Sequence, residues 1–240
     1  MHRAAPILAL IGILISLIHQ SSLGATYGIL KSRPVWFKPS MPILFVLSAV
    51  AVGPAVTMGL AIVVCWATGR RTVPVKALRT IARFSGFTLM AYAYFKFWDL
   101  AVISYYGRTP GTEKAFSLLY QTSPYGFGFW VGEVAVGIVL PVAIFLIPRF
   151  NRNLPNLVLG AFAAGIGILV HRWNVTVSGL TVPPDFSPGV LYQPEVAAYW
   201  PSLAEWGVAL GILGYAMLAL TLAIRYLPLF PPHETTRMIS

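Results

Sequence analysis

The sequence predicts an all-α membrane protein, a polytopic transmembrane helix bundle of about six spans that forms a single membrane domain over residues 1–240. Apolar residues make up 57% of the chain and charged residues only 10%, and the mean hydropathy is +0.74. So few charges cannot coat a soluble globule of this length. Apolar stretches of about 20 residues, the length that crosses a bilayer, recur between short charged or proline-rich connections.

The expected spans cover residues 5–24, 41–67, 84–106, 125–147, 155–178 and 202–225. The first follows Met1-His2-Arg3 and resembles a signal peptide. It reaches about 20 residues without a small-residue cleavage site, so we expect a retained helix. The connections, such as Arg70-Arg71-Thr72-Val73-Pro74 and Pro183-Pro184-Asp185, suit loops at the water interface.

Lysine and arginine orient the bundle, because short cytoplasmic loops carry an excess of them. One side carries more of these cations, namely Arg3, Arg70, Arg71, Lys76, Arg79, Arg83, Arg149, Arg152, Arg225 and Arg237. The other side carries Lys31, Arg33, Lys38, Arg108 and Lys114. We therefore expect both termini in the cytoplasm and the loops 25–40, 107–124 and 179–201 outside. These outer loops are rich in tyrosine and tryptophan, which suit the interfacial belt.

Charge and cysteine content exclude other classes of protein. The formal net charge of +10 suggests a nucleic-acid binder only at first sight, because the basic residues lie between apolar spans and not on a polar platform. A single cysteine, Cys65, lies within an apolar run. The chain therefore cannot build a disulfide framework or a cysteine-ligated iron–sulfur site.

Ionisable residues within the spans are the main functional signal, since holding them in a bilayer costs free energy. They are His19, Lys96, Asp99, Glu133, His171, Arg172 and Glu205. At 1.5 Å per helical residue, nearly all of them fall in the outer half of the membrane, with Lys96 nearer its middle. We expect none of them to face lipid. Their shared depth on five helices predicts one polar site.

Several of these residues have a simpler explanation. Lys96 and Asp99 stand three apart on one helix and can neutralise each other. Arg172 can extend to the outer headgroups, and Glu205 can stabilise the positive end of the sixth helix. No such explanation applies to Glu133, which lies about two turns inside its span. His19 is flanked by the polar run Gln20-Ser21-Ser22, which adds hydrogen-bonding partners.

Two-electron quinone chemistry would use such a set, because it needs an amphipathic pocket, hydrogen-bond donors and proton-exchanging groups. A b-type haem is the competing interpretation, and only His19 and His171 lie in spans to ligate it. A secondary transporter would show broken helices in two repeated halves. Gly53-Pro54 gives one break, without a repeat partner.

Six sequence elements, in order and spacing, carry a family resemblance. They are His19-Gln20-Ser21-Ser22-Leu23-Gly24 with a Pro-Val-Trp loop at 34–36, Lys96-Phe97-Trp98-Asp99-Leu100, Phe129-Trp130-Val131-Gly132-Glu133, His171-Arg172-Trp173-Asn174, and Tyr199-Trp200-Pro201-Ser202-Leu203-Ala204-Glu205-Trp206. With these elements the chain resembles the NrfD/PsrC superfamily of polysulfide reductase membrane subunits, and most closely the HybB-type subunit of hydrogenase-2-like complexes. The resemblance covers essentially the whole chain but only the last six of the family's roughly ten spans. We therefore expect a fragment, a misplaced start codon or half of a split subunit.

The resemblance implies a quinone-interacting subunit of a respiratory oxidoreductase complex in a bacterial or archaeal cytoplasmic membrane, not a stand-alone enzyme. It would bind menaquinone or ubiquinone near the outer face and carry no metal or covalent cofactor. Its implied partners are a four-cluster ferredoxin-like iron–sulfur subunit and a catalytic subunit, either a hydrogenase, a molybdoenzyme or a multihaem cytochrome.

By position, the resemblance makes His19, with Gln20, Ser21 and more weakly Glu205, the quinone-binding candidates. Asp99, Glu133 and Arg172 become candidates for a proton path or for shaping the site, and proton translocation is implied for some members. The alternatives are a membrane anchor or proton-conducting module without its own quinone, and a mono-haem cytochrome.

Overall fold

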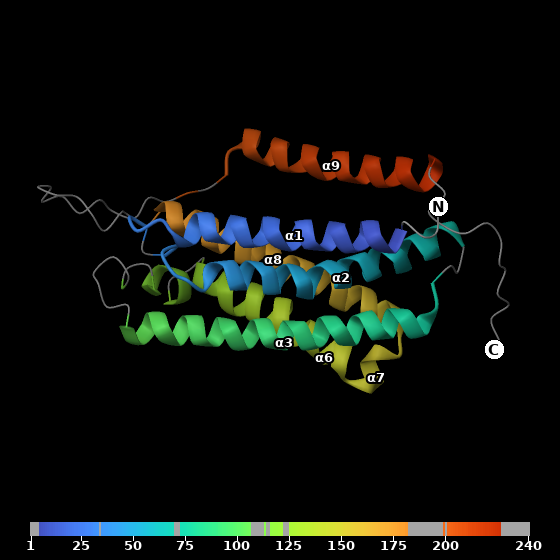
Figure 1. The fold of residues 1–240 in the computed structure, drawn as a ribbon, viewed down its shortest axis with the longest axis horizontal. Helices are drawn as coiled ribbons and strands as arrows, with labels where there is room; N and C mark the ends of the chain where they lie inside the picture. The colour runs from blue at the N-terminus through green and yellow to red at the C-terminus, as the bar shows by residue number, and fades with distance from the viewer. Residues whose placement is uncertain are drawn as a thin grey trace, which may run out of the picture. The chain divides into compact units, whose positions relative to one another are not determined.

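A computed structural model describes residues 5–33, 35–69, 73–106, 113, 116–121, 125–181, 199 and 201–226. Every regular element in this described part is helical (Figure 1). The chain divides into two compact units, Met1–Ala197 and Ala198–Ser240. The all-α prediction is therefore confirmed for the described residues.

The first unit contains the long helices α1 (Ala5–Gly28), α2 (Met41–Thr68), α3 (Val75–Tyr106) and α8 (Leu154–Thr181). A further helical run covers Tyr125–Leu146 and consists of α5 (Tyr125–Phe127), the π-helix η2 (Gly128–Val139) and α6 (Leu140–Leu146). Two short elements are η1 (Ser117–Gln121) and α7 (Pro148–Asn151). The second unit contains α9 (Leu203–Tyr226).

Five of these helical runs are long and apolar enough to cross a membrane, namely those that begin at Pro6, Met41, Tyr125, Leu154 and Leu203. Each falls on an expected span, so the multi-span membrane architecture is confirmed. The expected span 84–106 lies in α3, which is not among the five, because Lys96, Asp99 and several tyrosines lower its hydropathy. The orientation of the termini stays a prediction.

Helix α2 lies at the centre of the first unit and packs against α1, α3 and α8 (Figure 1). Its buried side includes Ala51, Ala55 and Met58, which join side chains of α3, α6 and α8 in one apolar core. Gly53-Pro54 does not break α2, which runs on through Pro54 and ends at the left-handed Gly69. The expected break at Gly53-Pro54 was therefore wrong.

Glycines allow η2 and α8 to approach closely. Gly128, Gly132 and Gly137 all turn toward α8, and a Cβ atom on Gly137 would collide with the backbone of Gly167. Their spacing of four and then five residues suits a π-helix, whose hydrogen bonds join residues five apart. Small residues at a helix crossing bring two backbones together, so side chains next to the crossing meet directly.

The connection from α1 to α2 is fixed to α8 by side chains. The Trp36 indole Nε1 donates to the Val175 carbonyl at 2.7 Å, and Arg33 donates to the carbonyls of Gly179 and Leu180 at 3.2 and 3.3 Å. Tyr27 meets the Trp36 ring edge-on at 4.9 Å between centroids. This connection therefore packs over the end of α8 that carries His171 and Arg172.

Candidate functional site

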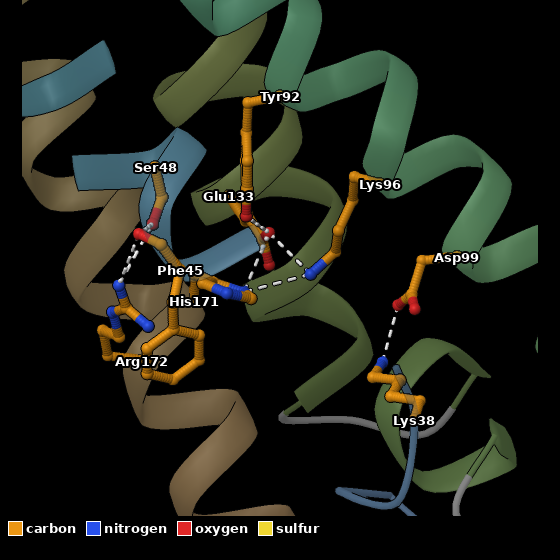
Figure 2. A network of polar contacts seen from close by, with 9 residues as sticks. All are labelled: Lys38, Phe45, Ser48, Tyr92, Lys96, Asp99, Glu133, His171 and Arg172. Atoms are coloured by element: carbon orange, nitrogen blue, oxygen red, sulfur yellow. Dashed lines mark hydrogen bonds and ion pairs between the residues drawn. The ribbon is translucent and has the colours of Figure 1, made fainter. Parts of the chain in front are cut away.

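A buried polar network joins α3, η2 and α8 around one carboxylate oxygen (Figure 2). Glu133 Oε1 accepts a hydrogen bond from Tyr92 Oη at 2.7 Å and lies 2.9 Å from Lys96 Nζ and 3.1 Å from His171 Nδ1. Lys96 Nζ also lies 3.0 Å from His171 Nδ1. Three helices thus direct their polar side chains at a single point.

These side chains are almost completely enclosed. Glu133 is 2% exposed, His171 is 1% exposed and Lys96 is 8% exposed. A buried charge without a partner is expensive, and the Lys96 ammonium supplies the charge that Glu133 needs. Removal of either member would leave the charge of the other buried without a partner, which strongly destabilises a protein.

The network retains unused hydrogen-bonding atoms. Among the described residues, neither Glu133 Oε2 nor His171 Nε2 has a hydrogen-bond partner. A cavity with room for about one water molecule is lined by Glu133, Tyr92 and Ser48 together with apolar residues. A site with a free carboxylate oxygen, an imidazole nitrogen and a phenol can hold and exchange protons.

Arg172 follows His171 on α8 and points to the other side, toward α1 and α2 (Figure 2). Its guanidinium carbon lies 3.4 Å from the centroid of the Phe45 ring. Its Nη2 atom donates to Ser48 Oγ at 3.1 Å and to the Phe45 carbonyl at 3.4 Å, and it lies 3.5 Å from Gln20 Oε1. Arg172 is therefore half-buried and held by side chains and backbone of α1 and α2.

Asp99 forms a second polar contact further along α3 (Figure 2). Its Oδ2 accepts from Lys38 Nζ at 2.6 Å, and its Oδ1 accepts from the Ser40 hydroxyl. Lys96, three residues earlier, pairs with Glu133 instead. The interpretation in which Lys96 and Asp99 neutralise each other was therefore wrong, because each reaches a partner on another element.

The predicted quinone-binding residues of α1 lie on two sides of that helix. Gln20 and Ser21 are half-buried, and Gln20 faces Arg172. His19 is exposed, and no hydrogen bond to its ring is present among the described residues. This differs from the expectation that no ionisable residue faces outward, because within the first unit α1 packs mainly against α2.

Glu205 makes only local contacts in the second unit. Its Oε2 accepts from the Ser202 backbone N–H at 2.7 Å and from the Ser202 hydroxyl at 2.9 Å. Its Oε1 accepts from Tyr199 Oη at 2.8 Å, and this bond raises the pKa of the Tyr199 phenol. These contacts form a capping box at the start of α9, as the simpler explanation of Glu205 proposed.

Sequence reasoning named Lys96 and His171 among the span charges but left them out of the candidate site. It missed Tyr92 and Ser48 entirely, and it counted Lys38 only among the cations of the outer loops. One available signal was the spacing of Tyr92, Lys96 and Asp99, which places all three on one side of a helix. Within the described part, no group of three histidine, cysteine or acidic residues could hold a metal ion. Pro34 and Trp200 of the sequence elements lie outside the described residues.

The fold and the site define a class of protein: a multi-span helical membrane protein with a buried carboxylate–ammonium–imidazole network in its core. Over residues 1–184 the sequence matches the polysulphide reductase NrfD family. The chain belongs to this family. The finer likeness to HybB-type subunits stays a prediction.

Curated relatives match along nearly the whole chain. The menaquinone reductase integral membrane subunit of Nitratidesulfovibrio vulgaris is 33% identical over 238 residues, which cover 96% of this chain and 55% of the relative. A selenate reductase subunit of Mesobacillus selenatarsenatis is 25% identical, and the match covers 95% of this chain and 53% of that relative. The Hdr-like menaquinol oxidoreductase integral membrane subunit of Archaeoglobus fulgidus is 22% identical, with 100% and 62% covered. This chain spans roughly half the length of the first two relatives.

Proposed function

We propose that this chain is the quinone-interacting membrane subunit of a respiratory oxidoreductase complex. It exchanges electrons between an extracytoplasmic iron–sulfur partner and the menaquinone or ubiquinone pool. The names of two relatives support a quinone substrate, since one is a menaquinone reductase subunit and another a menaquinol oxidoreductase subunit. The partner is a four-cluster ferredoxin-like subunit, joined to a hydrogenase, a molybdoenzyme or a multihaem cytochrome.

The contact of Arg172 with Gln20 is the observation that carries this proposal. It brings the polar run His19-Gln20-Ser21 of α1 beside the residue that follows His171 of the buried network. His19 is surrounded on α1 by exposed apolar side chains, with Ile15 61% and Ile18 68% exposed. An apolar surface with a hydrogen-bonding ring at its centre suits a quinone that arrives laterally from the bilayer.

The chain's own residues would supply hydrogen bonds and protons. Reduction of a quinone to a quinol takes two electrons and two protons, and the electrons come from the iron–sulfur partner. His19 would bond one carbonyl oxygen of the ring, and Arg172 would hold Gln20 in place beside it. The network of Tyr92, Glu133, Lys96 and His171 would store and pass protons, because it offers exchangeable groups in a dry environment.

Asp99 has a structural part in this proposal. Its bond with Lys38 ties the connection between α1 and α2 to α3, close to the helix ends that carry the site. We place Glu205 outside the pocket, since its carboxylate is already held by Ser202 and Tyr199. Proton translocation across the membrane would extend this function and requires a second route that these residues do not describe.

The test compares His19→Ala and Glu133→Gln with the control Thr26→Val in the complex purified from native membranes. Thr26 lies on α1, is exposed and bonds to the Ser22 carbonyl of its own helix, so its replacement should leave quinone chemistry unchanged. We expect both site variants to lose quinol formation by at least about 100-fold, the usual range for a general acid or base, with the complex still assembled.

Unchanged quinol formation in both site variants would overturn the proposal. Lipid extracts of the purified wild-type complex provide a second measurement, because a membrane anchor without a quinone site would carry no stoichiometric quinone. An absorbance spectrum of the same material with a Soret band would instead support the haem alternative.

A further inference from the structure

Five cations lie at the start of α3 and on the turn that contains α7, and a hydrogen bond joins these two segments. They are Lys76, Arg79 and Arg83 of α3, Arg149 of α7, and Arg152 directly after α7. Arg79 Nη2 donates to the Arg152 carbonyl at 3.0 Å, which fixes the start of α3 against this turn. We call these five residues the cationic end.

A second contact fixes the register of the same surfaces. Arg79, Arg83 and Gly86 stand at positions i, i+4 and i+7 and share one side of α3. Arg79 meets Arg152, and a Cβ atom on Gly86 would collide with Leu146 at the end of α6. Along α3, Arg83 thus stands between these two contact positions, and its side chain is exposed, as is that of Arg149 on α7.

No carboxylate neutralises this group within the described part of the chain. The ion pairs found there involve Lys38 with Asp99, and Lys96 and His171 with Glu133. None of the five cations takes part in them. Like charges on one surface repel each other, and an anion bound among them would relieve that repulsion.

Exposed apolar side chains adjoin the cationic end in the sequence of both elements. Phe84 is 50% and Phe87 is 64% exposed on α3, while Ile147 is 44% and Phe150 is 40% exposed beside Arg149. A small soluble anion would make no apolar contact with these side chains. Acyl chains would cover them, since a lipid phosphate lies at the membrane surface with its chains directed into the apolar layer.

We propose that the cationic end binds the phosphate headgroup of an anionic phospholipid, with the acyl chains against Phe84, Phe87 and Phe150. Arg83 and Arg149 would bond the phosphate oxygens from two elements. The lipid would then join α3 to the α6–α7–α8 turn and stabilise the bundle at this end. This site is independent of the quinone proposal, because none of its residues belongs to the network around Glu133.

The experiment places the purified full chain in nanodiscs of phosphatidylcholine alone or of phosphatidylcholine mixed with phosphatidylglycerol. We compare the double variant Arg83→Gln/Arg149→Gln with the control Lys31→Gln/Arg225→Gln, which removes the same charge elsewhere. Thermal unfolding is measured for each, and native mass spectrometry counts phosphatidylglycerol retained in detergent. The variant Arg83→Lys/Arg149→Lys keeps the charge and checks that replacement at these positions permits folding.

We expect phosphatidylglycerol to raise the unfolding temperature of the wild type, the control and the lysine variant. The glutamine variant should lose this rise and retain phosphatidylglycerol roughly thirtyfold less well, since each basic residue near an anionic surface contributes about fivefold. An equal rise in the glutamine variant, or no rise in the wild type, would overturn the proposal. An equal rise with inorganic phosphate in phosphatidylcholine nanodiscs would also overturn it, because the site would then be a plain anion site.

Discussion

Glu133 and His171 face each other across the helix crossing at Gly137 and Gly167, each four residues from its own glycine. Glu133 precedes Gly137 on η2, and His171 follows Gly167 on α8. The two helices run in opposite directions around the turn at α7, so both side chains come out on the same side of the crossing. The glycine pair therefore sets the distance of 3.1 Å between Glu133 Oε1 and His171 Nδ1.

Replacement of Gly167 by alanine should separate the two helices. The added methyl group would fall on the Gly137 backbone, which cannot move aside as a flexible side chain can. We expect a loss of about 1–3 kcal/mol in the free energy of unfolding, as for other overpacked cores. Gly165→Ala, on the same helix, is the control, because its methyl group would meet Val56 Cγ2 at 3.4 Å in ordinary contact. Equal unfolding curves for the two variants would show that the Gly137–Gly167 crossing does not determine how η2 packs against α8.

Lys96→Met should destabilise the protein through Glu133. The variant leaves a carboxylate in the core without its ammonium partner, which costs about 3–5 kcal/mol for a buried pair. Addition of Glu133→Gln should restore most of this loss, since no net charge then remains at the site. Chemical unfolding of the two single variants and the double variant gives the coupling energy. Additive losses would show that the two residues do not act as a pair.

Asp99→Asn should loosen the connection between α1 and α2. The Lys38 ammonium would lose its carboxylate partner at 2.6 Å, and hydrogen bonds to charged groups contribute about 1.5–3 kcal/mol. We expect amide hydrogen exchange over residues 35–40 to become roughly tenfold faster or more, with α2 itself unchanged. Lys31→Gln, an exposed replacement in the same connection, should leave exchange at the wild-type rate.

Arg172→Lys tests the guanidinium at its position over Phe45. A lysine keeps the positive charge but cannot stack a planar group on the ring while it donates to Ser48 and Gln20. Under the proposed function, we expect the KM for quinone to rise by about tenfold, because Gln20 would lose its fixed position, while kcat changes less. A kcat effect with unchanged KM would place Arg172 in proton transfer instead.

The helices were predictable because bilayer thickness sets their length. The expected span 41–67 is α2, Met41–Thr68, and 155–178 lies within α8. The shared level of Glu133 and His171 was predictable for the same reason, since the level of a residue follows from counting along its helix. The pattern of apolar stretches thus located the spans and placed these two residues side by side, while their depth in the membrane stays a prediction.

Helix rotation was not predictable, because helices that are apolar on all sides show no periodicity that identifies the inner face. His19 was expected to face inward and is exposed, while Gln20 beside it faces Arg172. The simpler explanation paired Lys96 with its neighbour Asp99, but Lys96 bonds across helices with Glu133. Lys38 comes from a connection and reaches Asp99, and pairs of this kind depend on tertiary packing alone.

The π-helical stretch η2 makes the centre of the protein sensitive to chain length. Glu133 and Gly137 both lie in its twelve residues, and each must meet a particular partner on α8. A deletion of one residue between them would rotate everything beyond it about the helix axis by the turn of one residue, which is about 100° in an α-helix and somewhat less in a π-helix. Either the glycine would leave the crossing or the carboxylate would leave the core. Insertions and deletions should therefore be tolerated in the loops of this protein but not within the helical span that contains η2.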